Sequence, residues 1–533
     1  MLNQKIRLLH ELVAHRALSH PDALALLHKD DTLTYSQLQS RVESVASGLV
    51  ALGLTADDRV AIYLPKQFET VIGFFAAAAA GGVSVPVNPM LKPQQVGHIL
   101  RDCNVRVLIT SAQRLKQLES VIQGCPDLEA IILTTERKPD APELATRLLG
   151  WDDVQGDGSS ACHERIDVDM AAILYTSGST GSPKGVVLSH ANMVAAAESS
   201  AEFLRLSQAD RLLAVLPLSF DYGLSQLTTA YFVGASVVLM DFLLAKEVVA
   251  AVARYSITGI SAVPPIWNQL AILDWPPEAV TSMRYLTTSG GAAQRSTLLR
   301  LKEALPSTGI YQMYGLTEAF RSSYLPPEEF DRRPGSVGKA LPNVELLVVR
   351  PDGSRCDPDE PGELVHRGSL VAMGYWNDPE RTAQRFRQAP GQPEGIPLRE
   401  MAVWSGDQMR MDAEGYLYFE SRQDEMIKTS GYRVSPTEVE EVVFASGLVT
   451  EAVAVGVTHP ELGQAIVLLV ETGTDAGVEV AVILKYCQKE LPSFMVPAHI
   501  EIAADLPRNP NGKIDRPNLR ARYSDFFTRE SSQ

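Results

Sequence analysis

A segment rich in glycine and hydroxyl residues has the residue types of a phosphate-binding loop. Residues 173–184 read ILYTSGSTGSPK, an apolar run followed by small residues and ended by a lysine. Glycine lets backbone N–H groups approach a phosphate closely, the hydroxyls add donors, and the lysine supplies positive charge. Pro183-Lys184 stands where a P-loop requires Gly-Lys, which weakens an ordinary ATPase interpretation. Such composition is also common in flexible connections, but the preceding run and the terminal lysine favour a polyphosphate site.

Alternating strand and helix patterns must position this segment. A helical pattern at residues 70–80 lies between two short β-rich runs, and further runs follow as far as about residue 290. The expected strands are residues 60–64, 83–87, 106–109, 130–133, 172–175, 211–215, 236–240 and 284–287. This repetition predicts an α/β fold with layered, largely parallel strands, in which ligands bind where strands end.

The texture of the sequence changes after residue 368. Gly-rich and turn-rich sequence with short alternating strands predicts a small β-barrel-like part of a large N-terminal domain. A compact βα pattern after residue 431 predicts a small α+β C-terminal domain. The predicted boundary divides the chain into residues 1–423 and 424–533.

Length, charge and cysteine content exclude several classes of protein. The chain has 533 residues, 45% of them hydrophobic and 21% charged, which indicates a globular protein of at least two domains. A net charge of −16 argues against a general binder of nucleic acid or anionic membranes. Five scattered cysteines without a CxxC pair indicate neither a disulfide framework nor a zinc site and favour a cytoplasmic location. The most apolar stretch, residues 74–87, is too short to span a membrane.

The string YTSGSTGSPKGV resembles the signature of the adenylate-forming superfamily, which comprises acyl-CoA synthetases, adenylation domains and luciferases. Further motifs of that superfamily follow in the expected order and extend the resemblance over nearly the whole chain. They are SGGA at 289–292, YGLTE at 314–318, SGD at 405–407, SRQD at 421–424, IKTSGYR at 427–433 and PRNPNGKID at 507–515. The strings FDYGLSQLTTA, YGLTEAFRSSYLPPEE and DEMIKTSGYRVSPTEVEE most resemble AMP-forming acyl-CoA ligases associated with exosortase and exopolysaccharide loci.

The resemblance implies an ATP-dependent ligase that converts a carboxylic acid into an acyl-AMP and releases pyrophosphate. The acyl group would pass to the thiol of coenzyme A or to the phosphopantetheine of an acyl carrier protein. Lys513, Thr317, Glu318 and Lys184 would be catalytic, and Thr180 and Glu318 would hold Mg²⁺, since a carboxylate beside phosphates requires a cation between them. The implied nucleotide contacts are Thr176, Ser177, Gly178, Ser179, Thr180, Gly181, Gly290, Gly291, Ala292, Tyr314, Gly315, Asp407 and Arg422.

The two half-reactions place opposite demands on the C-terminal domain. Lys513 would bridge the carboxylate and the phosphate during adenylation, and it would then occupy the route that the thiol must take. The resemblance therefore implies a mobile lid that rotates about Asp424. Rotation would withdraw Lys513 and bring Gly431, which resembles the glycine of the thiol tunnel, to the active site.

Phe220 and Asp221 stand where many fatty or aryl acyl-CoA synthetases carry histidine. The pair resembles the element of amino-acid adenylation domains in which the aspartate binds the substrate ammonium group. A buried carboxylate needs a cationic partner, so the alternatives for Asp221 are a substrate ammonium, an arginine or a helix cap. The predicted substrate-binding residues are Phe220, Asp221, Trp267, Gly291 and Gly431.

These residues lead to the hypothesis of an amino acid or small polar acid as substrate. A fatty or aryl acyl-CoA synthetase remains an alternative, as does an oxidative enzyme of the luciferase kind. The sequence contains no indication of the oligomeric state.

Overall fold

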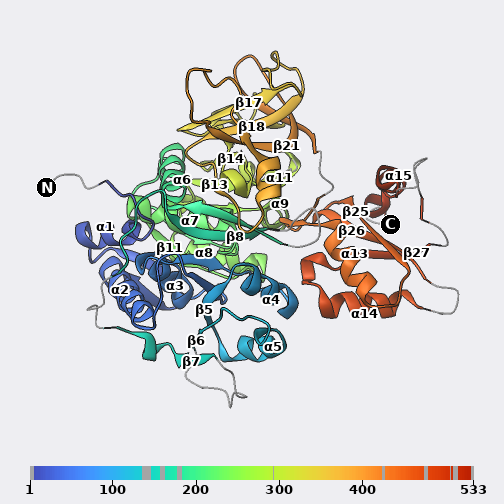
Figure 1. Ribbon diagram of the computed structural model, residues 1–533. Helices are drawn as coiled ribbons and strands as arrows, with labels where there is room; N and C mark the ends of the chain where they lie inside the picture. Colours follow the sequence, from blue (N-terminus) through green and yellow to red (C-terminus); the bar gives the residue numbers. More distant parts are fainter. Residues whose placement is uncertain are drawn as a thin grey trace.

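Three β-sheets with helices packed against them form the chain in the computed structural model (Figure 1). The structure describes residues 5–134, 146–156, 162–176, 183–291, 293, 295–422, 426–472, 478–503, 506–507 and 514–529. The two larger sheets are built from residues before 423, and the third begins at residue 427, which gives a large N-terminal and a small C-terminal part. This is the mixed α/β architecture that the sequence predicts.

An eight-stranded sheet carries the strand that leads to the glycine-rich segment. Thr176 is the last residue of one strand and Lys184 the first residue of its antiparallel neighbour, so the described residues on both sides of that segment are anchored in the sheet. In spatial order the strands are β19 (Gly374–Tyr375), β9 (Lys184–Ser189), β8 (Met170–Thr176), β4 (Val83–Pro86), β3 (Arg59–Tyr63), β5 (Val105–Thr110), β6 (Ala130–Leu133) and β7 (Arg147–Gly150).

A fourteen-stranded sheet combines a parallel half with an antiparallel half. In spatial order its strands are β17 (Val344–Val349), β18 (Gly362–Gly368), β21 (Met401–Met411), β22 (Leu417–Arg422), β16 (Ser336–Ala340), β15 (Ser323–Leu325), β14 (Gly309–Tyr314), β13 (Tyr285–Thr288), β12 (Gly259–Ala262), β10 (Arg211–Ala214), β11 (Ser236–Leu239), β1 (Leu24–His28) and β2 (Asp31–Thr34), with β20 (Phe386–Gln388) beside β21. Strands β1 and β10 to β14 run parallel, whereas β15 to β22, apart from β19, pair antiparallel. The turn-rich sequence after residue 368 thus continues the edge of the parallel sheet.

Helices connect the strands of these two sheets and cover them. They are α1 (Glu11–Ser19), α2 (Tyr35–Ala51), α3 (Phe68–Ala79), α4 (Pro93–Asp102), α5 (Ala112–Ile122), α6 (His190–Phe203), α7 (Asp221–Val233), α8 (Ala245–Tyr255), α9 (Pro264–Leu270), α10 (Pro277–Ser282), α11 (Arg295–Ala304) and α12 (Pro379–Arg385).

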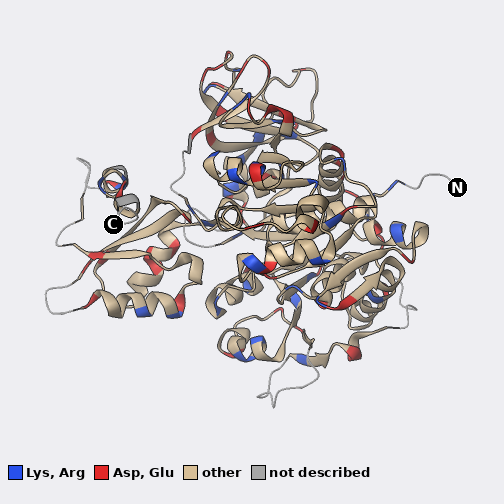
Figure 2. Ribbon diagram, turned by 180° about the vertical axis from the view of Figure 1, so that it is seen from behind, with Lys and Arg blue, Asp and Glu red and all other residues tan. Residues whose placement is uncertain are grey.

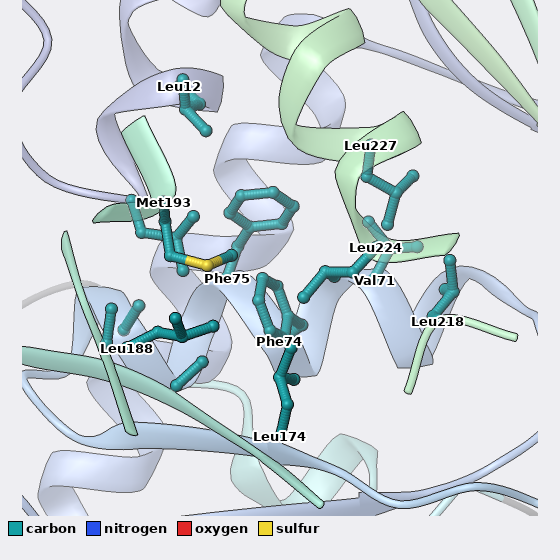
Figure 3. Close-up of a cluster of buried hydrophobic side chains, with 14 of the residues drawn as sticks. Leu12, Val71, Phe74, Phe75, Leu174, Leu188, Met193, Leu218, Leu224 and Leu227 are labelled. Atoms are coloured by element: carbon teal, nitrogen blue, oxygen red, sulfur yellow. The ribbon is translucent and has the colours of Figure 1, made fainter. Parts of the chain in front are cut away.

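The core between the two large sheets is built around α3. This helix is apolar on almost every side, as expected for a helix enclosed by other elements. Figure 3 shows Phe74 and Phe75 of α3 between Leu224 and Leu227 of α7 on one side and Leu174 of β8 on the other. Burying each such side chain stabilises the fold by about 1.5–3 kcal/mol. The core therefore holds the end of β8 at a fixed position relative to the start of α7.

The C-terminal part is a five-stranded sheet with helices on both faces. Its strands are β24 (Tyr432–Val434), β23 (Ile427–Thr429), β26 (Gly463–Glu471) and β25 (Glu451–His459), with β27 (His499–Ile502) beside β26. Alternate residues of β26 face opposite sides, so Ile466 and Leu468 pack toward α13 (Pro436–Ala445) and α14 (Val480–Glu490), while Val467 and Leu469 pack toward α15 (Arg516–Arg522) and α16 (Phe526–Arg529).

The C-terminal part lies beside α4 and α9 of the N-terminal part (Figure 1). Gln95 of α4 donates to Glu438 of α13 at 2.8 Å, and Asn268 of α9 donates to the Pro460 carbonyl at 3.3 Å. Basic and acidic residues are interspersed along both parts of the chain (Figure 2). Among the described residues, none of the helices combines the length and apolar character needed to cross a bilayer.

Candidate active site

One cavity lies where the two large sheets meet the C-terminal part. Its walls follow the carboxyl ends of parallel strands, with Val263 after β12, Ser289 and Gly290 after β13, and Gly315 after β14. Ligands bind at such ends because several strands deliver their following loops to one edge of a sheet. The C-terminal part contributes Lys428, Gly431, Tyr432, Arg433, Glu438, Phe494 and Met495 to the walls.

A buried ion pair lies at one end of this cavity. Lys184 Nζ donates to Glu318 Oε1 at 2.9 Å and to the Tyr375 hydroxyl at 2.6 Å, and that hydroxyl donates to Glu318 Oε1 at 2.6 Å. The Glu318 side chain, in the short 3₁₀ turn Thr317–Ala319 after β14, is 1% exposed. Strands of both large sheets therefore meet at this carboxylate.

Positive charge exceeds negative charge around Glu318. Burial raises the pKa of this carboxyl group, but the charges of Lys184, Arg433 and Arg385 outweigh burial and hold its pKa well below the ordinary range. Burial lowers the pKa of Lys184 to about 8, although Glu318 opposes the change. Three cations thus surround one carboxylate, and one of them, Arg433, belongs to β24 of the C-terminal part. Such a surplus suits a polyphosphate.

A second carboxylate lies behind the same strand. The Tyr314 hydroxyl, at the end of β14, donates a hydrogen bond to Asp407 Oδ2 in β21. Asp407 is 1% exposed, and its backbone pairs with that of Arg422 in β22. The structure therefore brings together three positions for which the sequence predicts nucleotide contacts. The bond from Tyr314 orients the carboxylate, which accepts hydrogen bonds only.

Asp221 lies in the cavity wall at the first residue of α7, next to Phe220. Burial raises the pKa of its carboxyl group to about 6, while the backbone N–H of Tyr222 and the guanidinium of Arg321 favour the ionised form. Both structural alternatives that the sequence leaves open, a helix cap and an arginine, thus contribute. Binding of a substrate ammonium by Asp221 stays a prediction.

Comparison with known proteins adds to this geometry. Residues 13–376 match the family described as AMP-binding enzyme, and residues 438–513 match the AMP-binding enzyme C-terminal domain. The chain belongs to the AMP-binding enzyme family. The adenylate-forming superfamily inferred from its motifs is thereby confirmed.

Relatives of this AMP-binding enzyme fall into two groups. It is 31% identical to a long-chain-fatty-acid–CoA ligase of Mycobacterium tuberculosis over 93% of this chain and 94% of that protein. It is 30% identical to tyrocidine synthase 3 of Brevibacillus parabrevis over 98% of this chain and 8% of that protein. The chain spans only 6% to 14% of the length of this synthase and of three similar peptide synthases.

A solved structure supports the same fold. A double mutant of o-succinylbenzoate CoA synthetase from Bacillus subtilis, bound with its product analogue, superposes with a TM-score of 0.81 at 27% identity. The match covers 96% of this chain and 98% of that chain. The large and small parts of this AMP-binding enzyme therefore have the architecture of an AMP-forming ligase.

The structure corrects the expected position of Trp267. This side chain is fully buried, and its indole N–H donates to the carbonyls of Ala262 and Thr287 at 3.1 and 3.0 Å. It packs in the core beside β12 and β13 rather than in the cavity wall, because α9 turns this face toward the sheet. Gly291 lies against Pro264 and is also not part of the wall.

The other predicted positions divide into two sets. Thr176, Phe220, Asp221, Gly290, Tyr314, Gly315, Thr317, Glu318 and Gly431 line the cavity. Ser177, Gly178, Ser179, Thr180, Gly181, Ala292, Asp424 and Lys513 lie outside the described residues, and Arg422 is described by its backbone alone.

Four residues of this AMP-binding enzyme's site are not predicted from the sequence. Tyr375, Arg385 and Arg433 surround Glu318, and Arg321 lies near Asp221. The available signal was weak, because Arg433 stands inside IKTSGYR and Arg321 shortly after YGLTE, both as ordinary basic residues. Their proximity to a buried carboxylate depends on contacts between distant segments.

Proposed function

We propose that this enzyme uses ATP to activate a carboxylic acid as an acyl-AMP and then transfers the acyl group to a thiol. The observation that carries the proposal is the buried Lys184–Glu318 pair, which lies with Arg433 and Arg385 at one end of a cavity that also contains Asp221. Membership of the AMP-binding enzyme family supports it. So does the identity to a CoA ligase over nearly its full length.

Activation requires positioning and charge neutralisation rather than covalent work by the protein. A carboxylate oxygen of the acid attacks the α-phosphorus of ATP, and the bond to the bridging oxygen breaks as pyrophosphate leaves with the electron pair. Lys184, Arg385 and Arg433 neutralise the charge that develops on pyrophosphate. Thr317 lines the cavity next to Glu318 and would contact the α-phosphate, while Lys513 would bridge the two reactants.

The residues at Glu318 fit a Mg²⁺ ion that arrives with the nucleotide. Glu318 is a buried, acceptor-only group, and among the described residues no three His, Cys, Asp or Glu side chains gather as a metal site. Mg²⁺ commonly takes one or two protein carboxylates and completes its shell with phosphate oxygens and water. Thr180 would add a hydroxyl. Bound in this way, Mg²⁺ would neutralise part of the phosphate charge.

Transfer requires a second arrangement of residues 424–533, which we propose to rotate about Asp424. The thiol sulfur attacks the acyl carbon, AMP leaves with the electron pair of the broken bond, and the thiol proton passes to solvent. Support comes from Gly431, which lies in the cavity wall with its carbonyl oxygen near Gly290 and its Cα against Val263. The acceptor would be coenzyme A or a carrier-protein phosphopantetheine.

Asp221 supports an amino acid or small polar acid as substrate, while the fatty-acid ligase relative supports a fatty acid as the second candidate. A pyrophosphate-exchange screen over amino, β-amino, aryl and fatty acids would separate them. We expect exchange only when an acid is present, followed by thioester formation with coenzyme A or a carrier protein. AMP release without any acid would indicate simple hydrolysis, and oxygen uptake with the acid would indicate the luciferase-like alternative.

The resemblance to exosortase-associated ligases supports a role in exopolysaccharide biosynthesis in the cytoplasm. Deletion of the chain should then reduce exopolysaccharide, and a Lys184→Gln variant should fail to restore it. Restoration by that variant would argue against a catalytic role in the pathway.

A further inference from the structure

Arg321 lies in the wall of the substrate cavity beside Asp221, and its charge has no carboxylate partner within 4 Å in the described part of the chain. The side chain is 5% exposed. One terminal nitrogen donates to Ser225 Oγ of α7, and the other lies 3.8 Å from Met313 Sδ. The Nε–H has no hydrogen-bond partner among the described residues.

The backbone before Arg321 is strained. Phe320 has φ 54° and ψ −51°, and the Arg321 N–H donates to the Ala319 carbonyl across it, which is the geometry of a γ-turn. Left-handed backbone is unfavourable for a bulky residue and persists where the surroundings enforce it, often at functional sites. The Phe320 ring is 1% exposed and holds the turn in place. The turn places Glu318 and Arg321, three positions apart, on the wall of one cavity.

The charges of the cavity limit which acids fit this end. Asp221 supplies one negative charge, and Arg321 supplies one positive charge near it but not in contact with it. An amino acid with a single carboxyl group would bring an ammonium to Asp221 and leave the buried guanidinium without a counter-ion. Uncompensated buried charge is strongly unfavourable. A substrate that also carries a second carboxylate balances both residues.

The available donors match a carboxylate. A guanidinium is a planar set of N–H donors that binds carboxylates with defined geometry, and the free Nε–H of Arg321 supplies such a donor. The Ser219 hydroxyl, 7% exposed in the same wall, also lacks a partner among the described residues. Two polar groups therefore remain for the substrate to satisfy.

We propose that the acid activated by this enzyme is an amino dicarboxylic acid. One carboxylate reacts with ATP, Asp221 binds the ammonium group, and Arg321 binds the second carboxylate. This assignment rests on the proposed function and names the substrate class of the same site.

The test compares acids that differ only at the second carboxylate. Acid-dependent pyrophosphate exchange of the full chain would be measured with aspartate against asparagine and glutamate against glutamine, beside monocarboxylic amino acids and fatty acids. We expect kcat/KM to be at least about tenfold higher for the better diacid than for its amide, the effect of one charge-assisted hydrogen bond. Arg321→Gln should remove or invert that ratio, and Arg321→Lys should keep its sign.

Two controls make the result specific. Arg410→Gln makes the same chemical change at an arginine that pairs with Asp359 and Glu420 outside the cavity, and it should leave the ratio unchanged. ATP binding by equilibrium dialysis verifies that each variant is folded.

Equal kcat/KM for diacid and amide, or a diacid preference that survives Arg321→Gln, would overturn the assignment. Highest activity with a monocarboxylic acid would overturn it while leaving acid activation intact. Absence of exchange with every acid would instead overturn the proposed function and this assignment together.

Discussion

Gly431 is the position where a single methyl group should separate the two half-reactions. Its φ is +81°, and a Cβ atom added there would lie 2.7 Å from both methyl carbons of Val263. Val263 is 5% exposed and β-branched, so its side chain has little freedom to move away. Gly431→Ala should therefore disfavour the arrangement in which β23 and β24 lie against the loop after β12.

The size of the effect follows from two contributions. The left-handed φ costs alanine about 1–2 kcal/mol in any arrangement of the two parts. The overlap with Val263 exists only in the arrangement seen here, and inserting a methyl group into a packed site costs about 1–3 kcal/mol. The second contribution alone shifts the balance between arrangements, by about 5- to 150-fold.

The assay measures each half-reaction separately with an acid identified in the exchange screen. Gly431→Ala should slow thiol transfer from supplied acyl-AMP by that factor and change pyrophosphate exchange by less than about twofold. Val263→Ala should recover part of the loss when combined with it. Gly447→Ala is the matched control, since Gly447 also has a positive φ, +68°, with no atom within 4 Å of the added Cβ. Equal slowing of both half-reactions, or an equal effect of Gly447→Ala, would refute this account.

Three further predictions concern charged residues. Lys513→Ala should lose pyrophosphate exchange yet retain thiol transfer from supplied acyl-AMP, and loss of both would reject its assignment to adenylation. The pKa of Asp221 is raised to about 6, so its charge is present above that pH and lost below it; the KM of an amine-bearing acid should rise as the pH falls through 6, and Asp221→Asn should remove this dependence. The pKa of Lys184 is lowered to about 8, so its cation is lost above that pH; the Kd for ATP should rise between pH 8 and 9, and a flat profile identical to that of Lys184→Gln would contradict the role of Lys184.

Strand positions are predicted well where the strands are buried. The expected runs at 130–133 and 172–175 correspond to β6 (Ala130–Leu133) and β8 (Met170–Thr176). Strands enclosed on both faces are continuous apolar runs, so their positions are visible without knowledge of their partners. Glu318 and Asp407 were also predictable as site residues, because each stands in a recognisable motif.

Orientation and long-range contacts were not predictable in the same way. Trp267 follows a buried strand, as expected, but which side of α9 faces the cavity depends on how that helix packs against β12 and β13. Arg433 and Glu318 are far apart in sequence and interact because β24 lies at the cavity. The local sequence around either residue contains no information about the other.

The sequence by itself determined the order of strands and helices, the α/β class and the motifs that identify the superfamily. These properties depend on periodicity and on residues close together in the chain. The tertiary structure alone decided which charges are buried together, including Arg321 beside Asp221 and two arginines beside Glu318. Burial and the distance between charges arise from packing of remote segments, and they set the pKa values and the charge balance that select a substrate.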